Sequence, residues 1–148
     1  MPKLAVSVLV VVHTAALEAL LLERAGRLGY WQSVTGSLER VDEPLEAAAA
    51  REVREETGIE AGRGRLRRWN VVNTFEIYAE WRHRFAPGTT HNTEHVFGLE
   101  LPGRLPVALA PQEHSAYLWL PWREAARQCF SWSNRDAVRM LGERAVIT

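Results

Sequence analysis

The sequence predicts an α/β fold in which helices cover both faces of a mixed β-sheet, that is, an α/β/α sandwich. The stretch Leu4 to Val12 is a β-branched apolar run with the length of a buried strand. The stretch Leu45 to Glu56 consists of good helix formers, and two more helices are expected near the C-terminus. Strands and helices are therefore expected to share one core.

Length and charge narrow the classes of protein to consider. The chain of 148 residues is long enough for one domain with a sizeable core, expected to span residues 1–148. Eighteen basic and 18 acidic residues give a formal net charge of zero, so neither nucleic acid nor a membrane is an expected partner. The single Cys129 cannot form an intramolecular disulfide, and the sequence shows no signal peptide, which together predict a cytoplasmic protein.

The other elements are predicted from local patterns along the chain. Five further strands are expected, at Ala19 to Glu23, Gly29 to Thr35, Trp69 to Phe85, His95 to Leu101 and Tyr117 to Leu120. Alternation in the longest of them places Phe75, Ile77 and Ala79 on one face, and Gly62 to Arg68 before it is expected to be a turn. Pro121 begins a helix to about Gln128, and Ser133 opens, as a capping residue, a last helix to about Arg144.

The stretch from residue 36 to residue 59 contains the most informative pattern. Pro44 fits the first turn of a helix, Asp42 or Glu43 is expected to cap it, and Gly58 ends it. Glu52, Glu55 and Glu56 stand at i, i+3 and i+4, so they project from one side of its C-terminal end. Such a cluster is either a solvated face neutralised by neighbouring arginines or a site for a divalent metal ion. Its position beside the apolar stripe of the helix favours the metal.

These residues resemble the signature of the Nudix family, in which a glycine, an acidic loop and an Arg-Glu helix follow one another at fixed spacing. The matched positions are Gly36, Glu43, Arg51, Glu52, Val53, Glu55, Glu56, Gly58 and Ile59. One departure is present, because six residues rather than five separate Gly36 from Glu43. The resemblance implies a Nudix-type sandwich and a pyrophosphohydrolase activity that uses Mg²⁺, with Mn²⁺ as a substitute.

Further strings are similar to the Nudix hydrolases of folate biosynthesis that act on dihydroneopterin triphosphate. They are WQSVTGS, FEIY, RHR followed by APG and NTE, the dipeptide EH before AYLWL, and SWSNR, and they extend from residue 31 to residue 135. The resemblance implies hydrolysis of that triphosphate to dihydroneopterin monophosphate and pyrophosphate. Two alternatives stay open, a Nudix enzyme acting on nucleoside triphosphates or dinucleoside polyphosphates and a non-catalytic binding module.

The resemblance also implies roles for individual residues. Glu52 and Glu56 would bind the metal, while Glu55 and Glu113 would each be a further ligand or the catalytic base. Gly36, Glu43 and Arg51 would support these carboxylates structurally. The residues carried over for substrate binding are Lys3, Arg24, Thr35, Phe75, Glu76, Ile77, Tyr78 and Ser131. Among these, Phe75 is equally well explained as a core residue and Arg24 as an exposed arginine at a strand end. The sequence does not indicate an oligomeric state.

Overall fold

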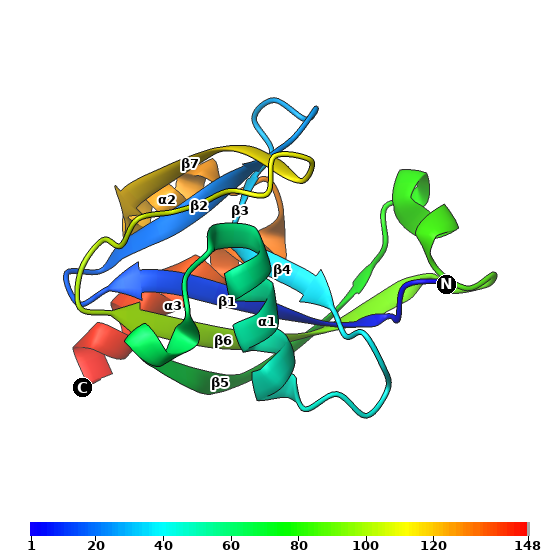
Figure 1. Cartoon of the computed structure of the whole chain (residues 1–148), viewed down its shortest axis with the longest axis horizontal. Helices are drawn as coiled ribbons and strands as arrows, with labels where there is room; N and C mark the ends of the chain where they lie inside the picture. The colour runs from blue at the N-terminus through cyan, green and yellow to red at the C-terminus, as the bar shows by residue number, and fades with distance from the viewer. Residues whose placement is uncertain (148) are drawn as a thin grey trace.

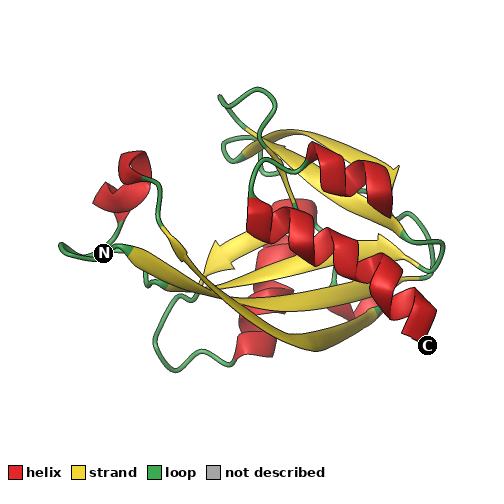
Figure 2. Ribbon diagram, turned by 180° about the vertical axis from the view of Figure 1, so that it is seen from behind, coloured by secondary structure: helices red, strands yellow, loops and turns green. Residues whose placement is uncertain are grey.

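The computed structural model describes residues 1–147, and its elements have the following bounds in chain order. They are β1 (Val6–Thr14), β2 (Glu18–Arg24), β3 (Trp31–Gln32), β4 (Val34–Ser37), α1 (Leu45–Thr57), η1 (Ala61–Arg63), β5 (Arg65–Glu76), η2 (Ala79–Arg84), β6 (His91–Leu101), β7 (His114–Pro121), α2 (Trp122–Gln128) and α3 (Trp132–Ile147). Helix α1 covers one face of the sheet, and α2 and α3 cover the other (Figures 1 and 2). The predicted α/β/α sandwich is therefore confirmed.

The sheet is mixed and is built around β1. Its strands follow the order β3-β2-β1-β6-β5, with β4 paired to β1 and β7 paired to β2. Strands β1 and β6 run parallel, whereas the other pairs are antiparallel. One edge of β1 is shared, because β4 pairs with its first half and β2 meets it only at His13. Strands β1 and β2 therefore diverge, and β4 pairs with the part of β1 from which β2 has separated.

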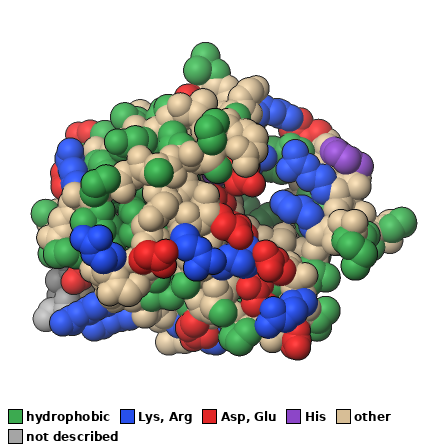
Figure 3. All heavy atoms as spheres, in the orientation of Figure 1, with side chains coloured by type: hydrophobic (Ala, Val, Ile, Leu, Met, Phe, Trp, Pro, Cys, Tyr) green, Lys and Arg blue, Asp and Glu red, His purple; other side chains and the backbone are tan. Residues whose placement is uncertain are grey.

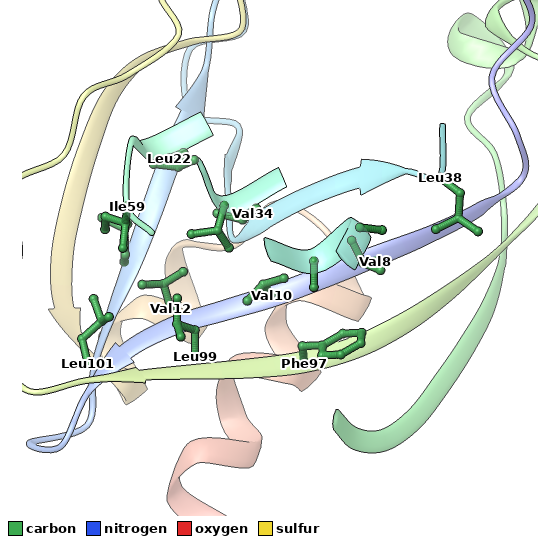
Figure 4. Close-up of a cluster of buried hydrophobic side chains, with 14 residues drawn as sticks. Val8, Val10, Val12, Leu22, Val34, Leu38, Ile59, Phe97, Leu99 and Leu101 are labelled. Carbon is green, nitrogen blue, oxygen red and sulfur yellow. The ribbon is translucent and has the colours of Figure 1, made fainter. Parts of the chain in front are cut away.

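Alternate residues of β1 pack into two separate cores. Val8, Val10 and Val12 lie in the cluster beneath α1, as Figure 4 shows. Leu9 and Val11 lie in the cluster beneath α2 and α3. Because both faces of the strand are covered, every position in this run must be apolar, which explains the uninterrupted β-branched sequence. Within residues 1–147, no helix combines the length and the apolar character that crossing a membrane requires.

Several predicted boundaries are wrong, and the largest error concerns the segment after α1. The first strand is Val6–Thr14 rather than Leu4 to Val12. The expected turn at Gly62 to Arg68 is a short 3-10 helix followed by β5, which begins at Arg65. This strand ends at Glu76 instead of reaching Phe85, and the chain then forms the 3-10 helix η2. Apolar and polar residues continue to alternate beyond Glu76, so their period could not reveal that the chain leaves the sheet.

Both predicted helix caps are also wrong. The N-cap residue of α1 is Pro44, which has no side-chain oxygen. Neither Asp42 nor Glu43 caps the helix, because its N-terminus has no side-chain cap hydrogen bond. Helix α3 begins at Trp132, and the hydroxyl of Ser131, not Ser133, accepts from the backbone N–H of Asn134 at 3.4 Å. The prediction for the other end of α1 is confirmed, because Gly58 adopts φ 74° and terminates the helix.

Candidate active site

The carboxylates of α1 differ in their burial. Glu52 is 8% exposed and Glu56 is 3% exposed, whereas the side chain of Glu55 is 48% exposed. One oxygen of Glu56, Oε1, is buried without a hydrogen-bond partner in the described part of the chain. Its carboxyl group interacts with Glu52 and with the backbone of Thr35. The helix therefore directs two acids inward, against β4, and leaves the third at the surface.

Gly36 makes room for one of these acids. Gly36 lies on the α1 side of β4, and its register partner Val8 in β1 faces the same side. A Cβ atom built at Gly36 would lie 2.0 Å from the carboxyl carbon of Glu52 and 2.2 Å from its Oε1. A side chain there would displace the Glu52 carboxylate, since non-bonded carbon atoms at rest are about 3.5–4.0 Å apart. The glycine of the signature is thus required by the close approach of the Glu52 carboxylate.

Arg51 binds both the loop before α1 and the acids at its end. Its Nε and Nη2 donate to the two carboxylate oxygens of Glu43, at 2.9 and 3.1 Å. Its Nη1 donates to Glu52 at 2.8 Å and to Glu55 at 3.3 Å. Glu43 also accepts from the backbone N–H of Glu39 at 2.9 Å. The additional loop residue after Gly36 therefore leaves Glu43 in reach of Arg51, in the geometry expected of a supporting pair.

The electrostatics of the two inward acids favour a bound cation. Burial raises the pKa of Glu56 well above its usual range, and the neighbouring charge of Glu52 raises it further. Burial also raises the pKa of Glu52, against the hydrogen bonds from Glu56 and Arg51 that lower it. Hard divalent cations prefer carboxylate oxygens, and two buried carboxylates with an unpartnered oxygen fit such an ion. Among residues 1–147, however, no three acidic, histidine or cysteine side chains already stand in a metal-holding arrangement.

Glu113 approaches this region from the loop before β7. Its side chain is exposed, and its backbone carbonyl accepts from the N–H of Ala25 at 2.8 Å, which attaches the loop to the end of β2. The charge of Glu113 raises the pKa values of Glu56 and Lys3, so the three groups share one electrostatic environment. Glu113 is therefore near enough to the α1 acids for its charge to affect Glu56.

His114 is a site residue that the sequence reasoning missed. It is 3% exposed, and its Nε2 lies 3.9 Å from Oε1 of Glu56 and 3.2 Å from Nε2 of Gln32. Burial lowers the pKa of this imidazole to about 4, and the charge of Arg24 lowers it further, so the ring is neutral at pH 7. The dipeptide EH drew attention only to Glu113. A buried neighbour of Glu56 could not be found without the pairing of β7 with β2.

Cationic side chains stand on the other side of the same space. Burial lowers the pKa of both Lys3 and Arg24, the charge of Arg84 lowers both further by repulsion, and the charge of Glu113 raises both. The backbone N–H of Lys3 donates to the carbonyl of Arg84 at 2.8 Å. Figure 3 shows a hollow with acidic side chains on the main body and basic side chains on the opposite rim. Acids that can hold a cation therefore face cations that can neutralise phosphate.

The segment of residues 78–89, here called the η2 arm, closes one side of this hollow. It projects from the sheet in Figure 1 and is held by aromatic contacts. Tyr78 and Trp81 pack edge to face at 5.1 Å, and the ring of Phe130 lies 6.3 Å from each. The guanidinium of Arg24 lies 4.7 Å from the centre of the Trp81 ring, a cation–π distance. Arg24 is thereby positioned by the arm as well as by β2.

The remaining residues expected to bind substrate do not all face the hollow in the same way. The side chain of Thr35 shares the face of its partner Leu9, away from α1, and its contact with Glu56 is through the backbone. The four consecutive residues carried over from the resemblance point in different directions. Phe75 packs edge to face with Trp132, Glu76 pairs with Arg82 in solvent, Ile77 is 4% exposed, and Tyr78 belongs to the arm.

Comparison with known proteins gives a consistent result. The NUDIX domain family model matches residues 3–141. The dihydroneopterin triphosphate diphosphatase of Escherichia coli is 42% identical over 92% of this chain and 91% of its own length. The Haemophilus influenzae protein of the same name is 32% identical over 90% of this chain and 84% of its own. The solved structure of the E. coli dihydroneopterin triphosphate pyrophosphohydrolase has a TM-score of 0.86 at 40% identity, covering 95% of this chain and 96% of that one.

Proposed function

Because the chain belongs to the NUDIX domain family, we propose that it is a metal-dependent pyrophosphohydrolase that converts dihydroneopterin triphosphate to dihydroneopterin monophosphate and pyrophosphate. The observation that carries the substrate is the similarity to relatives named for this activity, which extends over 92% of the chain. The buried acids at the end of α1 support the chemistry. Mg²⁺ is the proposed cofactor, with Mn²⁺ as a substitute, because carboxylate oxygens are the ligands that hard divalent cations prefer.

Glu52 and Glu56 are the proposed metal ligands, and Glu113 is a third ligand or the base. A divalent ion supplies charge neutralisation for the phosphates and an acidified water molecule when it is bound. Gly36 and Arg51 keep the Glu52 carboxylate in place, and the backbone of Thr35 does the same for Glu56. Ligand carboxylates fixed in this way need little rearrangement when charge develops on the phosphate.

Arg51 also affects metal binding through its hydrogen bonds to Glu52 and Glu55. Its guanidinium donates to the Glu52 carboxylate and to Glu55, at 2.8 and 3.3 Å. Both acids therefore share their negative charge with an internal cation. The side chain of Glu55 is 48% exposed. It can therefore turn toward a water molecule or an ion without creating a cavity in the protein. We assign Glu55 the role of orienting the attacking water or adding a ligand.

Lys3 and Arg24 are proposed to bind the phosphates of the substrate. Both lie near the acids, as their electrostatic coupling to Glu113 requires, and each is repelled by Arg84. A triphosphate would remove this repulsion by pairing with the three cations. Guanidinium groups bind phosphate oxygens through two parallel hydrogen bonds, which also fixes the orientation of the group that leaves.

The metal assignment is tested by Glu56→Gln. We expect turnover of dihydroneopterin triphosphate to fall about 100-fold or more, since the interactions of a catalytic metal contribute several kcal/mol. The fold should persist, because the substitution removes a buried charge. Glu60→Gln provides a matched control, an exposed acid just beyond the same helix. Unchanged turnover in the Glu56 variant would remove this acid from the metal site.

The substrate is tested by comparing catalytic efficiencies of the purified enzyme. Dihydroneopterin triphosphate is measured beside a panel of nucleoside triphosphates and dinucleoside polyphosphates, at saturating Mg²⁺. We expect dihydroneopterin triphosphate to have the highest kcat/KM. A tenfold preference for any nucleotide would instead assign the chain to the nucleotide-hydrolysing members of the family.

A further inference from the structure

A group of polar side chains is buried in the sheet face that α3 covers, apart from the α1 acids. Glu94 of β6 is 3% exposed and is the register partner of both Ser7 in β1 and Asn73 in β5. Asn92, two residues earlier, faces the same way and is 6% exposed. Val96, again two residues along, packs in the core beneath α3, which fixes the side of the sheet on which the group lies. An apolar core would be expected at these positions.

The hydrogen-bonding groups of this cluster are incompletely paired. Oε1 of Glu94, Oδ1 of Asn92 and Nδ2 of Asn73 are buried atoms without a hydrogen-bond partner in the described structure. A hydrogen bond with Ser133 of α3 partly offsets the burial of the Glu94 carboxyl. An unpaired buried polar group costs about 1–3 kcal/mol, and native proteins pair nearly all of them. Two acceptors and one donor on neighbouring strands therefore lie in one region without a partner in the described structure.

From this arrangement we propose that Glu94 recognises the 2-amino-4-oxopyrimidine edge of the substrate, an edge that pterin and guanine share. The carboxylate of Glu94 accepts hydrogen bonds from the 2-amino group and the adjacent ring N–H. The amide of Asn73, directly opposite in the sheet, donates to the 4-oxo oxygen. The proposal rests on the proposed function for its pterin substrate, and it adds the residue that selects this heterocycle.

The position of Glu94 relative to the metal site agrees with one bound molecule. Thr35 of β4, whose backbone contacts Glu56, shows its side chain on the same sheet face as Glu94. Strand β1 lies between β4 and β6, so the two strands are separated by two strand spacings, about 10 Å. A pterin and a triphosphate joined by a three-carbon side chain can bridge such a separation. The heterocycle would thus lie on β6, on the face that the Thr35 side chain shares, and the phosphates would have to pass β4 to reach the α1 acids on the other face.

Two aromatic side chains lie beside the polar cluster, and one of them reaches the surface. Phe75 is the register partner of Asn92, and its ring packs edge to face with Trp132 at 6.4 Å. Trp132, at the start of α3, is 47% exposed. A flat ring that entered beside these two would gain stacking area and hydrogen bonds together. Glu76, the acid carried over for this role from the resemblance, is instead exposed and paired with Arg82.

The test measures binding of neopterin, which carries the same edge without phosphates, by quenching of its fluorescence in the absence of metal. Turnover is not needed, so the outcome is independent of the proposed activity. Glu94→Gln places an amide opposite the 2-amino group, and we expect the Kd to rise about 10- to 100-fold, as for loss of a charged hydrogen bond. Glu100→Gln, an exposed acid on the same strand, is the matched control and should bind neopterin as the wild type does.

A second ligand pair and a second variant make the result decisive. Guanosine should bind better than inosine, which lacks the 2-amino group, and Glu94→Gln should abolish this difference. Asn73→Asp, at a half-buried position, should weaken neopterin binding about tenfold by opposing the 4-oxo oxygen with an acceptor. Neopterin affinity that is unchanged in both folded variants would overturn the proposal. Failure of the wild type to hydrolyse dihydroneopterin triphosphate, with neopterin binding intact, would instead overturn the proposed function.

Discussion

The buried Glu94 predicts an unusual dependence of stability on pH. Burial raises the pKa of this carboxyl from 4.5 to about 7 in the folded protein, whereas an unfolded chain leaves it near 4.5. The folded state therefore holds the proton more tightly than the unfolded state, and the free energy of unfolding falls as pH rises between these values. The difference of about 2.5 between the two pKa values corresponds to about 3 kcal/mol. This contribution is complete below pH 4.5 and is lost once the pH exceeds about 7.

Glu94→Gln removes the titration while keeping the size of the side chain. At pH 8 we expect the variant to be more stable than the wild type by up to about 3 kcal/mol, because an ionised buried carboxylate is replaced by a neutral amide. Near pH 5 the two proteins should unfold at similar urea concentrations. Urea unfolding at several pH values between 5 and 8 measures the difference, and subtraction of the two curves cancels titrations elsewhere.

A constant difference between the two proteins across this range would refute the reasoning. It would mean that the carboxyl titrates alike in the folded and unfolded states, in spite of its 3% exposure. Glu100→Gln, which alters an exposed acid of the same strand, should leave the pH profile unchanged and so controls for the change in net charge. Saturating neopterin should reduce the wild-type loss of stability at pH 8, since hydrogen bonds from the ligand favour the ionised carboxylate.

Three further predictions concern the proposed metal site and the arm. Gly36→Ala should weaken Mg²⁺ binding in calorimetry by tenfold or more, because the new Cβ would occupy the position of the Glu52 carboxylate. Arg51→Met should lower the free energy of unfolding by about 3 kcal/mol, since it leaves buried acids without their cation, and chemical denaturation measures the loss. Trp81→Ala should speed proteolysis and amide exchange in the η2 arm with little change in overall stability, because the residue stacks on Arg24 rather than in either core.

Local chemistry explains which parts of the fold the sequence predicted correctly. The end of α1 follows from Gly58, and the inward direction of Glu52 and Glu56 follows from helical spacing alone. The first strand was found because a run buried on both faces has no competing helical pattern. The predicted bounds of this strand lie two residues too early in the chain. The strand ends where its pairing with β6 ends, and β6 is more than 80 positions away in the sequence. Such partners leave no trace in the local sequence.

The parts that the sequence could not predict depend on contacts between distant segments. His114 lies beside Glu56 only because β7 pairs with β2, and Glu94 is buried only because β5, β1 and α3 surround β6. Residues two apart in a strand face the same side, so Glu94 shares the inward face of Val96. This alternation is the one local signal of its burial. The arm was missed because its residues alternate as a strand does, although its backbone forms a 3-10 helix.

The two sets of buried acids impose complementary requirements on any ligand. Glu56 has an unpartnered oxygen in a site repelled by Glu52, which a cation relieves, whereas Glu94 has an unpartnered oxygen opposite a donor amide, which a planar donor edge relieves. Phosphate alone satisfies the cationic rim but neither acid. A nucleobase without a 2-amino group leaves Glu94 unpaired at a cost of about 1–3 kcal/mol, which corresponds to roughly 5- to 150-fold in affinity. A triphosphate that carries a 2-amino-4-oxopyrimidine and binds with a divalent ion satisfies the cationic rim, Glu56 and Glu94 together. Selectivity for the substrate therefore follows from the unpaired groups rather than from the shape of the cleft.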